Sequence, residues 1–294
     1  MYDICCVGHI TLDKIVTPGR RVEMPGGTSY YFSNAIRQMD VRYLLVTAIA
    51  SSEKRFVDML ISQGIEVKTF DSEQTVCFEN IYQHDMNHRE QKVWAQSDPF
   101  HTAQLDGTDA RIFHLGPLLA GDIPGDLIRS LSEKGIVSMD AQGFLREVRE
   151  NAVFPVDWPA KKELLAFVDV LKANEEEMHV LTGEKDIRKG AAILASWGVK
   201  EVLITLGSNG SVVLTDGQYY DIPAFINGDA VDATGCGDTY MAGYLYQRAK
   251  GAEPDQAALF ASAMAGLKVM ASGPFTGTKE DVEQMIAGEV KIQK

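Results

Sequence analysis

The sequence predicts an α/β protein built on a mainly parallel sheet. Strand-like and helix-like runs alternate along nearly the whole chain, and only two stretches interrupt the alternation. Regular alternation is typical of βαβ units, in which helices cover both faces of a parallel sheet. The chain has 294 residues, of which 45% are hydrophobic and 23% charged. That is enough for one large core, so we expect a single domain over residues 1–294.

The alternating elements are defined by the period of their apolar residues. Short apolar runs predict strands at 4–7, 43–49, 111–115, 135–139, 167–171 and 202–206. Helical spacing and terminal signals predict helices at 29–39, 53–63, 124–133, 186–197 and 239–248. Residues 211–214 follow the last strand after Asn209-Gly210, which predicts a hairpin there.

Residues 13–24 and 75–96 break the alternation. In the second stretch Val76, Phe78 and Asn80 recur at every other position, which is typical of a β-hairpin. Together the two stretches predict a small antiparallel sheet that projects from the α/β core. The pattern favours equally a flap over a ligand site and a purely structural extension of the sheet.

The charge and hydropathy of the chain argue against nucleic-acid and membrane partners. Lys plus Arg number 28 and Asp plus Glu 41, a formal net charge of −13. Nucleic-acid binders cluster basic residues, and this chain has no basic run beyond pairs. No apolar stretch reaches the roughly 18 residues of a membrane span, and the first residues lack the basic start of a signal peptide. We therefore expect a cytoplasmic protein with no nucleic-acid or membrane partner.

The most informative motif is Asp-Ala-Thr-Gly-Cys-Gly-Asp at 232–238, just before a predicted helix. Gly235 and Gly237 flank Cys236 and allow their N–H groups to converge on one point. The helix start adds unpaired N–H groups and a positive dipole end, which together favour an anion. A carboxylate at Asp238 would repel that anion, unless it takes a proton from a hydroxyl that attacks phosphorus. An acidic N-cap after a Gly-rich turn is the structural alternative.

Several motifs, in order along the chain, resemble those of the pfkB, or ribokinase-like, carbohydrate kinases. The 232–238 motif resembles the family's second signature, with Cys236 where the family usually has Ala. Pro-Gly-Gly-Thr at 25–28 resembles its first, and Asp13 lies where the family has a substrate-binding aspartate. Asn174 to Glu177 resembles its Asn-x-x-Glu element, and 205–210 its nucleotide-binding loop. The resemblance covers nearly the whole chain.

The resemblance implies a three-layer ribokinase-like sandwich with a β-sheet lid, and ATP-dependent phosphorylation of a hydroxyl on a sugar or polyol. Asp238 would be the general base, and the main-chain N–H groups of Gly235, Cys236 and Gly237 would stabilise the transferred phosphoryl group. Lid sheets in the family often pair between subunits, so we expect a homodimer through the lid.

The remaining donor-side roles also follow from the resemblance. Mg²⁺ would be held near Asn174 and Glu177, chiefly through water. Nucleotide-binding residues would be Asn174, Thr205, Gly207, Ser208 and Gly210. Some family members bind a monovalent cation near the loop that here contains Asp232, so such a requirement stays open.

The acceptor end is less closely matched. Asp13 can accept hydrogen bonds from neighbouring hydroxyls, and Gly26 and Gly27 allow close approach of a sugar. Tyr31 stands where ribokinase has a polar sugar contact, which argues against ribose, although Tyr31 could equally be a packing residue. Gln142 follows a strand and is a further candidate. The overall pattern resembles the inositol-kinase-like branch.

Four other functions are alternatives to this assignment. A nucleoside kinase of the same family would use the same chemistry on another acceptor. A non-catalytic relative would have lost the base or the cradle, yet Asp238, Gly235 and Gly237 are present. The lack of G-x-G-x-x-G after the first strand argues against a dinucleotide-binding oxidoreductase, and the lack of any Gly-Lys pair excludes a P-loop NTPase.

Overall fold

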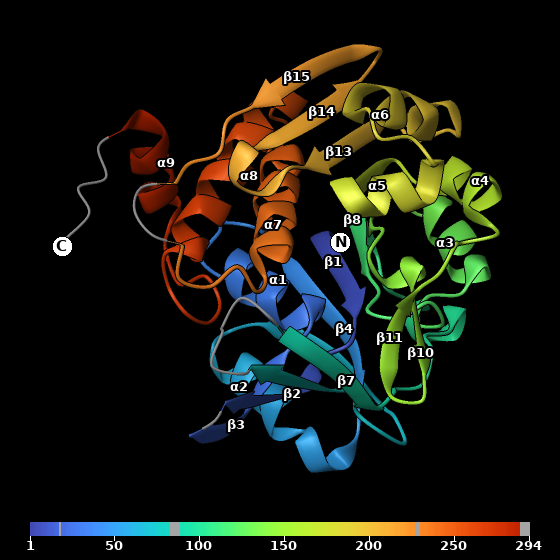
Figure 1. Ribbon diagram of the computed structural model, residues 1–294, viewed down its shortest axis with the longest axis vertical. Coiled ribbons are helices and arrows are strands. Elements are labelled where there is room, and N and C mark those ends of the chain that lie inside the picture. Colours follow the sequence, from blue (N-terminus) through green and yellow to red (C-terminus); the bar gives the residue numbers. More distant parts are fainter. Residues whose placement is uncertain (18, 83–88, 227–229, 289–294) are drawn as a thin grey trace.

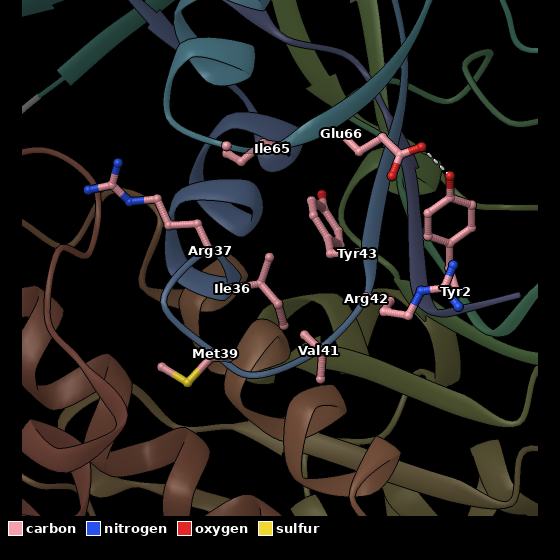
Figure 2. A pocket seen from close by; sticks show the side chains of 10 residues that line it. Tyr2, Ile36, Arg37, Met39, Val41, Arg42, Tyr43, Ile65 and Glu66 are labelled. Carbon is pink, nitrogen blue, oxygen red and sulfur yellow. Dashed lines mark hydrogen bonds between the residues drawn. The ribbon is translucent and has the colours of Figure 1, made fainter.

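The computed structural model describes residues 1–17, 19–82, 89–226 and 230–288 (Figure 1). Part of the predicted 75–96 stretch, residues 83–88, therefore lies outside the described residues. Two sheets organise the chain, a nine-stranded one and a six-stranded one. Among the described residues, no helix combines the length and apolarity that a membrane span requires.

The nine-stranded sheet is parallel except at one edge. Its spatial order is β15-β14-β13-β12-β9-β8-β1-β4-β5, and only β14 and β15 run antiparallel to their neighbours. The strands are β1 (Tyr2–Gly8), β4 (Tyr43–Ile49), β5 (Glu66–Asp71), β8 (Ala110–Gly116), β9 (Ile136–Asp140), β12 (Val170–Asn174), β13 (Glu201–Thr205), β14 (Ser211–Thr215) and β15 (Gln218–Ile222).

Helices cover both faces of this sheet, as Figure 1 shows. Alternate residues of β1 face opposite layers: Ile4 and Cys6 join one core, Cys5 and Val7 the other. The first layer contains α1 (Thr28–Ile36), α2 (Arg55–Ser62), α7 (Cys236–Ala249), α8 (Pro254–Val269) and α9 (Lys279–Ala287). The second contains α3 (Gly125–Ser132), α4 (Lys161–Leu164), α5 (Glu175–Thr182) and α6 (Ile187–Ser196).

The second sheet, here called the small sheet, has the order β10-β11-β7-β6-β2-β3. Its strands are β2 (Thr11–Thr17), β3 (Arg20–Gly26), β6 (Cys77–Tyr82), β7 (Arg89–Ala95), β10 (Arg146–Arg149) and β11 (Ala152–Pro155). Val76, Phe78 and Val93 pack on Leu118 and Leu119, which follow β8 directly. The small sheet is thereby anchored beside the carboxyl ends of the parallel strands.

The predicted fold class is confirmed, and the predicted elements differ from the structure mainly at their ends. The small sheet is not purely antiparallel, because β2 and β6 pair in parallel. It also contains β10 and β11, which the sequence patterns did not assign to it. These two strands meet at a tight turn in which Glu150 and Asn151 both have positive φ, at 49° and 67°. Such φ values suit a two-residue hairpin.

Candidate active site

The candidate site lies at the carboxyl edge of the parallel strands. Asp140 ends β9, Asn174 ends β12 and Thr205 ends β13. Asn174 and Thr205 are direct partners in the β12–β13 register. Open α/β sheets bind ligands outside the carboxyl ends of their strands. The predicted donor-side residues are therefore gathered where ligands bind in this architecture.

The predicted anion cradle is the start of α7, a 14-residue helix. Gly235 is its N-cap, with φ of +76°, and a Cβ there would collide with the ring of Tyr31. Both observations explain why glycine occupies this position. Among the described residues, no acceptor is found for the N–H groups of Gly235 and Gly237, whereas the N–H of Cys236 donates to Ala233 O at 3.2 Å. Two of the three predicted donors are thus free to meet an anion, and the third is engaged.

Asp238 lies in the first turn of α7 and is half-buried. Burial raises the pKa of its carboxyl to about 6, and the negative charge of Asp140 acts in the same direction. The Lys172 ammonium and a hydrogen bond with Thr28 oppose this rise. The carboxylate is therefore ionised at neutral pH and remains a stronger base than a solvated aspartate.

A buried ion pair lies beneath the cradle. Lys172 Nζ is 2.6 Å from Asp140 Oδ2, and both side chains are nearly inaccessible to solvent. The two residues are direct partners in the β9–β12 register. A Cβ on Gly237 would lie 2.8 Å from Lys172 Nζ, so the ammonium lies immediately next to the cradle.

Each charge of this ion pair keeps the other group ionised. Burial disfavours ionisation of Asp140, but the Lys172 ammonium outweighs it and holds the pKa of Asp140 below its usual value. Burial likewise disfavours the charged Lys172, and Asp140 outweighs it and raises the Lys172 pKa. The pairing of the two residues could not be predicted from sequence, because a lone lysine in an apolar strand gives no sign of its partner.

The predicted acceptor residues converge on the start of the small sheet. Asp13 Oδ1 accepts a hydrogen bond from Thr11 Oγ1 at 2.6 Å, and a Cβ on Gly26 would collide with the Asp13 carboxylate. Gly27 has φ of +84°, and a Cβ there would lie 2.7 Å from His9 O. Pro-Gly-Gly thus lets the chain turn from β3 into α1 directly beside Asp13.

Tyr31 joins the acceptor residues to the cradle. Its side chain is 4% exposed, its ring lies against Gly235, and the charges of Asp13 and Asp238 act on its hydroxyl. Burial, together with these carboxylates, raises the Tyr31 pKa, so the phenol remains protonated. So little exposure fits the packing role that the sequence left open. Gln142 is half-buried in the loop after β9, and its N–H donates to Asp140 Oδ1 at 3.1 Å.

Asn174 and Glu177 form a capping box at the start of α5. Asn174 Oδ1 accepts from the Glu177 N–H, and Glu177 Oε2 accepts from the Asn174 N–H, both at 2.8 Å. Burial raises the pKa of Glu177, and the Lys172 ammonium partly opposes this. Within the described residues, no group of three acidic, His or Cys side chains could enclose a metal ion. The pair therefore fits an ion held through water better than one bound directly.

The loop at 205–210, predicted to bind the nucleotide, joins β13 to β14 in the hairpin that Asn209-Gly210 predicts. Thr205 pairs with Ser211, and Gly207 and Ser208 form part of a single 3₁₀ turn. Gly210 has φ of +89°, and a Cβ there would collide with Ile222 O. The loop stands next to Asn174 at the same edge of the sheet.

A helix-start cradle with a carboxylate in its first turn, on a ribokinase-like α/β sandwich, defines a kinase. The family model described as "pfkB family carbohydrate kinase" matches residues 71–281. This is most of the chain, and the chain therefore belongs to the pfkB family of carbohydrate kinases.

Related proteins agree with this assignment. One such relative is a pyrophosphate-dependent kinase in the ribokinase family, solved in complex with a pyrophosphate analog and myo-inositol. Its sequence is 30% identical to this chain, and the two structures superpose with a TM-score of 0.85 over 95% of this chain and 99% of the relative. The cytidine kinase of Thermococcus kodakarensis is 27% identical over 265 residues, 85% of this chain and 90% of that protein. Ribokinase of Arabidopsis thaliana, solved with ribose and ATP, shares the fold with a TM-score of 0.80 at 20% identity, covering 97% and 98% of the two chains.

Proposed function

We propose that this kinase transfers the γ-phosphoryl group of ATP to a hydroxyl of a small polyol, with an inositol-like cyclitol as the preferred acceptor. The observation that carries the proposal is Asp238, a half-buried carboxylate in the first turn of the cradle helix, with a pKa raised to about 6. The cyclitol is supported by the 30% identity to a kinase solved with myo-inositol.

Asp238 acts as the general base. It accepts the proton of the acceptor hydroxyl while that oxygen bonds to the γ-phosphorus, and the bond to the β–γ bridging oxygen breaks to leave ADP. The hydrogen bond with Thr28 holds the carboxylate in place. A positioned base of this kind contributes roughly 10²–10⁴-fold in rate.

The cradle and Lys172 stabilise the charge on the transferred group. The N–H of Gly237, for which the described residues offer no acceptor, lies at the positive dipole end of α7, and the Lys172 ammonium lies next to Gly237. The Cys236 N–H joins them only if its bond to Ala233 O opens. Loss of one comparable donor costs roughly 10²–10³-fold in rate.

On the acceptor side, Asp13 binds hydroxyls and the Gly26-Gly27 backbone permits close approach. Tyr31 supports both ends of the site by packing rather than by direct contact, and Gln142 contributes to the acceptor site from the loop after β9. The small sheet serves as the lid, formed chiefly by residues 13–24 and 75–96, and excludes water that competes as a phosphoryl acceptor. Its outer strands, β3 and β10, are edges at which two subunits can pair.

On the donor side, the nucleotide lies along the β13–β14 loop, at Thr205, Gly207, Ser208 and Gly210. Asn174 and Glu177, which form the capping box of α5, would hold Mg²⁺ through water. When bound, the ion neutralises charge on the β- and γ-phosphates.

A second candidate is a nucleoside kinase that uses the same base and cradle. It is favoured by the similarity to the cytidine kinase of Thermococcus kodakarensis over 90% of that protein. The similarity to a pyrophosphate-dependent kinase likewise makes pyrophosphate the donor to compare with ATP.

The test is product formation over a panel of inositols, pentoses, hexoses and nucleosides, with Mg-ATP and Mg-pyrophosphate as donors. We expect turnover of one cyclitol within roughly 1–100 s⁻¹ and a loss of at least about 10²-fold in Asp238→Asn. Turnover of nucleosides alone selects the second candidate. Failure of the chain to bind either donor refutes the kinase mechanism, and full activity in Asp238→Asn refutes the base.

A further inference from the structure

Lys268 is a fully buried lysine whose ammonium is surrounded by oxygen atoms. It lies in the last turn of α8, and its side chain is 0% exposed. Nζ donates to the main-chain oxygen of Asp232 at 2.8 Å and lies 3.5 Å from that of Ala271. It is also 3.3 Å from the Asp232 carboxylate.

The Asp232 carboxylate extends this cluster into two further segments. Oδ1 accepts the N–H of Thr234 at 2.9 Å, and Oδ2 accepts the N–H of Gly273 at 3.2 Å. The ammonium and the carboxylate therefore tie together the end of α8, the 271–273 turn and the 232–234 loop. That loop continues directly into Gly235, the N-cap of the cradle helix.

Burying this ammonium has a cost. Desolvation of an ion costs several kcal/mol unless close, well-oriented partners compensate for it. An apolar side chain could fill the same volume at the end of α8, but it could not bind the Asp232 oxygens. Carbonyl and carboxylate oxygens arranged around one point are also what a monovalent metal cation binds.

We propose that Lys268 is a positioning residue that acts as a tethered cation, holding the 232–234 loop so that the cradle is formed without a dissociable monovalent ion. The inference rests on the proposed function, because the cradle is the part of the site that it orders. Lys268 touches neither donor nor acceptor. It acts through Asp232 and the loop.

The first test does not depend on turnover. Hydrogen exchange of residues 231–237 and the thermal midpoint are measured for the parent, Lys268→Met and Lys268→Ala, in potassium and in tetramethylammonium chloride at equal ionic strength. We expect the parent to be the same in both salts. Loop exchange should rise about 10-fold or more in Lys268→Met, since each factor of ten corresponds to roughly 1.4 kcal/mol of lost loop stability.

Lys268→Ala leaves room at the Asp232 oxygens. Potassium or methylammonium should therefore restore part of its loop protection, while Lys268→Met, which fills the space, should respond less. Lys250→Met is the matched control, because Lys250 is a lysine at the end of α7 with 40% side-chain exposure and a surface pair to Asp40. It should leave loop exchange and the salt response unchanged.

Kinetics form the second test. Lys268→Met should lower kcat by about 10²-fold, the cost of a small misplacement of catalytic groups, with the acceptor KM little changed. If Lys268→Met does not fold, Asp232→Asn serves instead, since it keeps an oxygen for Thr234 N–H but loses the charge that faces the ammonium.

The proposal is overturned if potassium protects the parent loop or activates the parent several-fold over tetramethylammonium. It is also overturned if Lys268→Met, or Asp232→Asn in its place, keeps normal loop exchange. If the panel contains no acceptor, the exchange and thermal results still decide the role of Lys268, so its failure and that of the proposed function remain distinguishable.

Discussion

Replacing Asp238 with Asn should make the protein more stable and nearly inactive. Burial and the Asp140 charge raise the Asp238 pKa from 3.8 to about 6 in the folded chain. A carboxyl with a raised folded pKa holds its proton more tightly when folded, so unfolding releases a proton between these two pH values. The contribution of Asp238 to the free energy of unfolding is therefore fully present below about pH 4 and is lost as the pH rises through about 6.

The magnitude follows from that shift. About two pKa units at 1.36 kcal/mol each correspond to about 3 kcal/mol of destabilisation, fully present at neutral pH. Asn removes the charge, and its carbonyl oxygen can still accept from the Thr28 hydroxyl. Asp238→Asn should thus exceed the parent by up to about 3 kcal/mol at pH 7 and match it near pH 4, while losing at least about 10²-fold in kcat.

The assay is urea unfolding of both proteins at several pH values, with the slope m compared to confirm the same unfolding reaction. Asp140→Asn is the contrasting variant. Its carboxyl has a lowered pKa and pairs with Lys172, so its removal leaves a buried ammonium unpaired and should destabilise by roughly 3–5 kcal/mol. This prediction is refuted if the parent is more stable than Asp238→Asn at pH 7, or if the difference in their free energies of unfolding does not vary with pH. Either result would show that the surroundings do not disfavour the charged carboxylate.

Three further predictions concern the same site. The parent kcat/KM should fall tenfold per pH unit below about pH 6 as Asp238 gains its proton, and a pH profile without that limb would contradict its role as base. Lys172→Met should lower kcat/KM for the donor by about 10²-fold, with less effect on the acceptor KM. Steady-state kinetics with both substrates varied would measure the two effects. Equal effects on donor and acceptor would mean that Lys172 supports folding rather than the donor site. Glu177→Gln keeps the capping box but loses the charge, so the thermal midpoint should stay the same or rise. The Mg²⁺ concentration needed for half-maximal rate should increase about 10-fold. An unchanged Mg²⁺ requirement would show that Glu177 does not help to hold the ion.

The parallel core could be predicted from sequence because its signals are local. The strand expected at 43–49 is β4 with the same bounds, since six apolar residues and one threonine in a run of seven are typical of a strand buried on both faces. The turn at Gly235 and Gly237 was also predictable, because two glycines just before a helix indicate a backbone turn that other residues adopt less readily. These features depend on residues that are close together in the chain.

The small sheet was harder to predict, because its strands come from distant segments and carry polar residues. β10 reads Arg-Glu-Val-Arg, which has no clear apolar alternation, and β11 is only four residues long. The Glu150-Asn151 turn was a usable signal, since Asn tolerates positive φ. The parallel pairing of β2 with β6 had no comparable signal, because 60 or so residues and two core strands separate them.

The electrostatics of the site depend on strand order, which sequence patterns do not contain. Lys172 meets Asp140 only because β9 and β12 are neighbours, although 32 positions separate the two residues. The Lys172 ammonium is therefore paired directly with the Asp140 carboxylate, and its attraction for the second carboxylate, Asp238, is weaker. The pKa of Asp140 is lowered while that of Asp238 is raised. Two carboxylates whose pKa values are driven apart in this way take different roles, and the one with the raised pKa is the group suited to accept a proton.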